Sequence, residues 1–310
     1  MPSLYSSTNV PMFCRHETFH PRYGWLKKGF DKASTEHTIF AREDAHIILG
    51  VGKNMAKAIR YWCFAFKVLD EAEDALGRSH QMVPSEFGVK LLGDKGWDPY
   101  LEDPGSLWLL QWSLLKPPCR ATAWYFTFNE FNQLIFTAED LFSALKEFKE
   151  RLFPSSKVAD SSLRKDVNCI LRMYVRHNNL RGPSEDSLDC PFADLGLLQD
   201  YGDTKHYSFN MGSKYELPAE IIVVCCLDFI SRIESSAKTI SISRLLYDIG
   251  SPGHVFKLSD PSLREAIDKV STDFPDISLS ETAGLIQFSF KRPPSLLVEQ
   301  VLTKYYRKRK

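Results

Sequence analysis

His16, Glu17 and His20 match the HExxH motif of zinc proteases literally. In those enzymes both histidines lie on one face of a continuous helix and bind zinc, while the glutamate acts on the metal-bound water. Pro21 follows at once and would end or prevent such a helix. A metalloprotease is therefore the least favoured function, and His16 with Glu17 is either a local hydrogen-bonded pair or a catalytic proton-transfer pair beside a bound phosphate.

A second candidate site is acidic. Asp98, Glu102 and Asp103 lie close together in the sequence, and such carboxylates could hold the Mg²⁺ or Mn²⁺ that phosphodiester hydrolysis usually needs. The competing interpretation is structural, because Asp103 precedes Pro104 and is well placed to cap the helix that follows. The same two alternatives apply to a second acidic group, which comprises Glu185, Asp186 and Asp189.

The most informative segment, 41–62, predicts a helix-turn-helix. Leu49 would close a first helix, Gly50 can adopt the positive φ of the turn, and Val51 would fill the space between the helices. The second helix would turn Ala56 and Ile59 inward. Its other face would present four side chains to the major groove of DNA, where Asn can bind adenine and Lys or Arg can bind guanine or phosphate: Lys53, Asn54, Lys57 and Arg60. An ordinary packed helix pair with a basic surface is the alternative.

Upstream of that motif, cations alternate with aromatic residues. Arg22, Lys27 and Lys28 could contact backbone phosphates while Tyr23 and Trp25 pack or stack. Trp25 is equally well explained as a core residue. The segment therefore adds to the DNA-binding hypothesis without establishing it.

These side chains need a scaffold, and the composition allows one. Hydrophobic residues make up 44% of the 310 residues, and 39 Lys and Arg balance 39 Asp and Glu, which excludes a disordered or fibrous chain. No apolar run is long enough to span a membrane. The seven cysteines include no C-x-x-C pair, which favours a reduced, cytoplasmic compartment. The neutral total does not exclude a polyanionic partner, because segments of net positive charge alternate with segments of net negative charge.

The periodic segments predict a mainly α (α+β) fold of winged-helix and helix-turn-helix modules with short β-hairpins. A small, polar stretch at 154–162 divides the chain into a DNA-binding domain at 1–155 and a helical domain at 163–310, which ends in a winged-helix-like pattern. Within these domains, 107–112 predicts a buried helix, Thr137 a helix cap, and 124–128, 207–210 and 285–290 predict strands.

Motifs along nearly the whole chain resemble the SspB proteins, the DNA-nicking component of Ssp-type DNA phosphorothioation and phage-defence systems. The matching segments, in chain order, are HETF at 16–19, RYGWLKK at 22–28, LGVGKNM at 49–55, RYW at 60–62, DPYLED at 98–103, EDSL at 185–188, LGL at 195–197 and TAGL at 282–285. The resemblance implies nicking that opens the backbone for sulfur insertion by partner proteins. It assigns no catalytic residues, and it leaves His20 outside the motif.

The sequence thus predicts a cytoplasmic protein that binds double-stranded DNA and nicks one strand with a divalent metal ion, Mg²⁺ or Mn²⁺. The expected partners are DNA and other DNA-modification or defence proteins, without a membrane, and a homodimer stays open. DNA binding follows from the residues, whereas nicking follows chiefly from the resemblance. The alternative function is a non-enzymatic regulator or scaffold that recruits modification enzymes through the same helix face.

Overall fold

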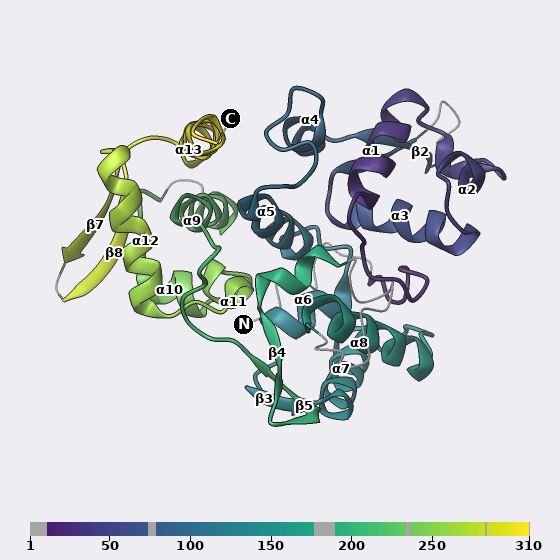
Figure 1. The fold of residues 1–310 in the computed structure, drawn as a ribbon. Coiled ribbons are helices and arrows are strands. Elements are labelled where there is room, and N and C mark those ends of the chain that lie inside the picture. The colour runs from purple at the N-terminus through teal and green to yellow at the C-terminus, as the bar shows by residue number, and fades with distance from the viewer. Residues whose placement is uncertain (1–10, 74–78, 177–189, 234–236, 283, 310) are drawn as a thin grey trace.

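The computed structural model describes residues 11–73, 79–176, 190–233, 237–282 and 284–309, which fold into helices with small antiparallel sheets (Figure 1). Up to residue 155 the elements are α1 (Trp25–Thr35), the 3₁₀ helix η1 (Ile39–Ala41), α2 (Ala45–Ile48), α3 (Lys53–Ala65), β1 (Leu69–Glu73), β2 (Ser79–Pro84), α4 (Glu86–Leu92), α5 (Pro104–Leu115), α6 (Thr122–Asn129), β3 (Ile135–Thr137) and α7 (Ala138–Leu152). The predicted mainly α fold with short β elements is confirmed.

The second half of the chain also consists of helices and short strands. Its elements are α8 (Asp160–Tyr174), the 3₁₀ helix η2 (Pro191–Leu195), β4 (Leu198–Tyr201), β5 (Asp203–Phe209), α9 (Ala219–Ile233), β6 (Thr239–Ser241), α10 (Ile242–Tyr247), α11 (Pro252–Phe256), α12 (Asp260–Asp273), β7 (Ile277–Thr282), β8 (Leu285–Phe290) and α13 (Pro294–Arg307). None of the helices in the described ranges is long and apolar enough to cross a membrane.

Two three-stranded sheets share one construction. In each, a short strand runs straight into a helix and pairs with the second strand of a later hairpin, which yields the orders β3-β5-β4 and β6-β8-β7. Thr137 caps α7 in a capping box with Asp140, and Ser241 caps α10. This order of elements is compatible with winged-helix modules, which stay a prediction. The domain division also stays a prediction; β3 pairs with β5 across the 153–159 linker.

Long buried helices form the centre of the molecule. Every residue of α5 from Gly105 to Leu115 is buried, as expected for a helix that is apolar on all sides. In Figure 1, α5 and α9 lie between the helix-turn-helix region and the β7–β8 hairpin. The strand predicted at 124–128 is wrong, because these residues belong to α6. All eight α6 residues are buried, so the segment has no periodicity, and its aromatic composition imitates a strand.

Close packing of α1 on α3 orients the helix-turn-helix. A Cβ added at Gly29 of α1 would lie 2.5 Å from Sγ of Cys63 and 2.8 Å from the Ile59 side chain, both of which belong to α3. Only glycine permits this approach of the two helices. The buried face of α3 is thereby fixed against α1, and its opposite face is left toward solvent.

Lys67 follows the C-terminal end of α3 and links this helix to α5. Its backbone has a φ of 58°, and its ammonium donates to the carbonyl of Ser113 and, at 3.0 Å, to that of Lys116 at the end of α5. A cation at this position satisfies carbonyls that have no partner within the helix. Burial lowers the pKa of Lys67 from 10.5 to about 7.

We expect a specific pH dependence from Lys67. Between pH 7 and 10.5 the unfolded chain holds the lysine proton and the folded chain releases it, so this residue's contribution to the free energy of unfolding rises with pH. In urea unfolding, the free energy of unfolding of the wild type minus that of Lys67→Met should therefore increase from pH 6 to pH 9. A difference that is constant or shrinks over this range would contradict the assignment.

Candidate nucleic-acid interface

The turn between α2 and α3 has the predicted geometry. Gly50 adopts a φ of 64°, Leu49 is buried, and Gly52 precedes α3 in an extended conformation. The ammonium of Lys28 donates to the Leu49 carbonyl at 3.0 Å. Lys28, which the sequence predicts to contact phosphate, therefore stabilises the turn. The first helix is a single turn of four residues, and in it Ala45 is buried while His46 is half-buried.

The two faces of α3 separate as the sequence predicts. Ala56 and Ile59 are buried. Lys53, Asn54 and Lys57 are exposed. The fourth predicted DNA contact, Arg60, is half-buried, with 38% of its side chain exposed. The basic flank of α3 therefore reaches solvent, which a groove-binding helix requires.

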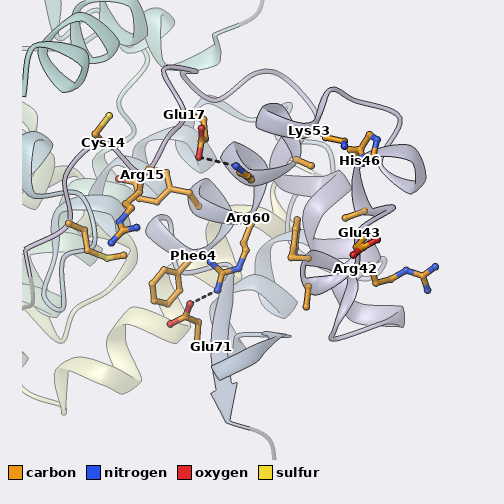
Figure 2. Close-up of a pocket in the computed structure, with 17 residues that line it drawn as sticks. Cys14, Arg15, Glu17, Arg42, Glu43, His46, Lys53, Arg60, Phe64 and Glu71 are labelled. Carbon is orange, nitrogen blue, oxygen red and sulfur yellow. Dashed lines mark hydrogen bonds and ion pairs between the residues drawn. The ribbon is translucent and has the colours of Figure 1, made fainter. Parts of the chain in front are cut away.

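This flank forms one wall of a pocket of about 610 Å³ (Figure 2). The other walls come from the turn around Cys14, from η1 with α2, and from β1. The charged lining comprises five cations and three carboxylates: Arg15, Arg42, Lys53, Lys57, Arg60, Glu17, Glu43 and Glu71. An excess of cations in a concave site attracts anions, because the low-dielectric walls concentrate the field.

Ion pairs hold three of the pocket cations. Arg42 pairs with Glu36 and Asp44 at 3.0 and 2.7 Å. Nζ of Lys57 lies 3.7 Å from Oε1 of Glu17, and a guanidinium nitrogen of Arg60 donates to Glu71 at 2.6 Å (Figure 2). Lys53, in contrast, makes no ion pair within the described part of the chain. The basic flank thus combines an unpaired lysine with two cations already matched to carboxylates.

His16 faces away from the pocket. Its side chain is fully buried, its Nε2 lies 2.8 Å from Oδ1 of Asp166 on α8, and its ring packs against Trp62 and Trp124. Burial raises the pKa of the Asp166 carboxyl, and the hydrogen bond from His16 opposes that rise. Of the two predicted catalytic residues, only Glu17 lines the pocket; His16 is paired with Asp166 instead.

The HExxH segment is a turn. Glu17 and Thr18 have φ values of 51° and 68°, so His16 and His20 do not share a helix face. Among the described residues, no group of three or more His, Cys, Asp or Glu side chains is arranged to hold a metal ion. The helical geometry that a zinc protease needs is therefore absent from this segment.

The upstream cations are also engaged locally. Arg22 lies 5.6 Å from the centre of the Trp25 ring. Lys27 is 13% exposed, and its ammonium donates to Asp31 at 2.8 Å and to the Leu92 carbonyl at 3.1 Å. These contacts fix α1 in place, and neither Arg22 nor Lys27 lines the α3 pocket.

The acidic turn at 98–103 serves the fold. The buried carboxylate of Asp98 accepts from the backbone N–H groups of Glu102 and Asp103 at 3.0 and 2.9 Å and from the Ser106 hydroxyl at 2.6 Å. Asp103 caps α5 and accepts from Tyr305 of α13 at 2.6 Å. Glu102 is exposed. In the described structure these three carboxylates do not form a group arranged to hold a metal ion, and their ligation of Mg²⁺ or Mn²⁺ stays a prediction. The acidic group at 185–189 lies outside the described residues.

Comparisons with known proteins place the chain in a family. A family model described as "Protein of unknown function (DUF4007)" matches residues 13–306. Two solved structures, described as "Magnesium ion-bound SspB crystal structure" and "SspB crystal structure", are 37% and 38% identical to this chain, each with a TM-score of 0.92. They match 98% of this chain and 90% and 91% of their own. The chain belongs to the SspB family. The search of curated proteins found no match.

Sequence reasoning missed several residues of this SspB-family pocket. Arg15, Arg42 and Glu71 reach the pocket from separate elements, and Asp166 holds the adjacent turn through His16 and the Cys14 backbone N–H. Arg15 directly precedes His16 and Glu17, the predicted catalytic residues, so its position in the sequence could have marked it as a site residue. Nothing in the sequence marks Glu71 or Asp166, because their partners are distant along the chain.

The structural role of the acidic turn can be tested by substitution. Asp98→Ala removes the acceptor for three donors, and we expect it to lower the free energy of unfolding by about 2 kcal/mol. Glu102→Ala, in the same turn but exposed, should have little effect. Thermal unfolding with and without Mg²⁺ provides the measurement. A Mg²⁺-dependent stabilisation that Asp98→Ala abolishes would restore this turn as a metal site.

Proposed function

We propose that this SspB-family protein binds double-stranded DNA through the exposed face of α3 and nicks one strand within an Ssp-type phosphorothioation and phage-defence system. The observation that carries the proposal is the solvent-facing Lys53, Asn54 and Lys57 flank beside a pocket with excess positive charge. The similarity to solved SspB structures over 98% of the chain supports the same system.

The geometry of α3 suits the major groove. Lys53 and Asn54 lie in its first turn, where a recognition helix contacts base edges, and Lys57 follows one turn later. Asparagine can bind adenine through two hydrogen bonds, while lysine can bind guanine or phosphate. We therefore assign base contacts to Asn54 and Lys53 and a backbone contact to Lys57.

The nicking step is proposed with a divalent metal ion but without a metal-ligand assignment. One of the similar structures is described as magnesium-bound, which supports a divalent cation for this chain. Glu17 stays a catalytic candidate because it lines the pocket, whereas His16 is buried against Asp166. We propose that other proteins of the modification system act together with this chain.

A regulator or scaffold without nicking activity is the second candidate. It is favoured by the structural use of Asp98 and Asp103, two of the carboxylates that the sequence offered as ligands of a divalent metal ion. Such a protein would use the same α3 face to bind DNA. DNA binding is thus common to both candidates, and strand cleavage separates them.

Removal of the α3 charges should weaken DNA binding. We expect Lys53→Gln with Lys57→Gln to reduce affinity for a 20-bp duplex about ten-fold or more. The negative slope of log K against log salt should become shallower by about 0.9 for each lost phosphate contact. Fluorescence anisotropy at several salt concentrations measures both quantities. Lys238→Gln with Lys269→Gln changes the same charge at exposed positions near β6 and in α12, and should leave binding nearly unchanged. Equal effects of the two double variants would refute the α3 contact.

Cleavage is tested on supercoiled plasmid with Mg²⁺ or Mn²⁺. We expect open circles that accumulate with time and are lost when EDTA is added, because the metal stabilises the charge that develops on the phosphate. Linear products should not appear first, since only one strand is cut. Retardation of the plasmid in a gel without any relaxation would support the regulator instead.

A further inference from the structure

We infer that Glu17 and Glu71 occupy, in the free protein, the positions that DNA backbone phosphates take in the complex. Lys57 and Arg60 would then exchange these carboxylates for phosphates on binding. The inference rests on the proposed DNA binding and deepens it, because it assigns the pocket as a phosphate site and names the internal competitor for each cation.

The first observation behind the inference is the placement of two cations in the pocket. Lys57 and Arg60 are three residues apart on α3 and therefore lie side by side on one face of the helix. Both line the pocket of about 610 Å³, which has room for a nucleotide-sized group. The pocket is continuous with the Lys53 end of the flank that we place against DNA.

The second observation is that each of these two cations is paired with a carboxylate. Arg60 donates to Glu71 at 2.6 Å, and Lys57 lies 3.7 Å from Glu17. Carboxylate and phosphate oxygens offer a guanidinium or ammonium the same charge-assisted hydrogen bonds, so one can replace the other. All four side chains are between 33% and 65% exposed, and ion pairs in such positions are weak enough to be displaced.

The exchange predicts how the removal of a carboxylate changes the affinity for DNA. A phosphate must compete with Glu71 for Arg60, so removal of that carboxylate should strengthen DNA binding. Glu43 provides a matched charge control, because it lines the same pocket but makes no ion pair in the described ranges. General electrostatic attraction alone would give Glu43 and Glu71 similar effects.

The experiment compares Glu71→Gln, Glu17→Gln and Glu43→Gln in anisotropy titrations with a 20-bp duplex. We expect Glu71→Gln to tighten binding about three- to five-fold, the size of one exposed ion pair, and Glu43→Gln about two-fold or less. The gain from Glu71→Gln should vanish in an Arg60→Gln background, because the cation it frees is no longer present. Glu17→Gln acts on the separate Lys57 pair and serves if Glu71→Gln fails to fold.

Three results would overturn the inference: equal gains at Glu43 and Glu71, a gain that survives without Arg60, or weaker binding by Glu71→Gln.

A second measurement separates this inference from the proposed function. Thymidine 5′-monophosphate should shift the Arg60 Nε–H NMR signal, more strongly in Glu71→Gln than in the wild type, whereas thymidine should not. If duplex binding is absent but this shift occurs, the pocket assignment stands and the DNA-binding proposal falls. If the nucleotide causes no shift in either protein, the phosphate site is refuted.

Discussion

The contact of α1 with α3 at Gly29 decides which side of the helix-turn-helix meets solvent. Any side chain at this glycine would collide with Cys63 and Ile59, so the two helices could not pack this closely. With that face of α3 buried, Lys53 and Lys57 are directed outward. The same packing places the Lys28 ammonium on the Leu49 carbonyl, which stabilises the turn. The orientation of the proposed DNA-binding face is therefore a consequence of core packing rather than of its own charges.

The buried His16–Asp166 pair plays a comparable part for the opposite wall of the pocket. Asp166 belongs to α8, far along the chain, and its carboxylate also accepts from the backbone N–H of Cys14 at 3.0 Å. This pair ties the N-terminal turn to the second half of the protein. Glu17 follows directly and projects toward Lys57. A histidine that the sequence offers for catalysis thus acts by holding its neighbours in position.

The acidic turn illustrates how one sequence pattern is compatible with two different roles, metal binding and structural hydrogen bonding. Asp98 and Asp103 have the residue type and spacing of metal ligands, yet in the fold they bind backbone N–H groups, Ser106 and Tyr305. Tyr306 completes the link from α5 to α13 through a hydrogen bond of 2.9 Å to Ser106. Asp103 also pairs with the guanidinium of Arg309, so donors of the protein itself account for both carboxylates. The turn joins α5 to the C-terminal helix α13, and this structural role accounts for its acidic residues.

Local features followed from the sequence. The Gly50 turn, the inward Ala56 and Ile59, the Thr137 cap and the buried α5 helix each depend on residues within one or two turns of each other. The predicted strand at 124–128 failed because complete burial of α6 removes the periodicity that identifies a helix. Tertiary structure alone decided that His16 pairs with Asp166 and that Arg60 meets Glu71 in a pocket beside Lys57. The reason is physical: these contacts join separate elements, and their partners are chosen by the packing of those elements rather than by spacing along the chain.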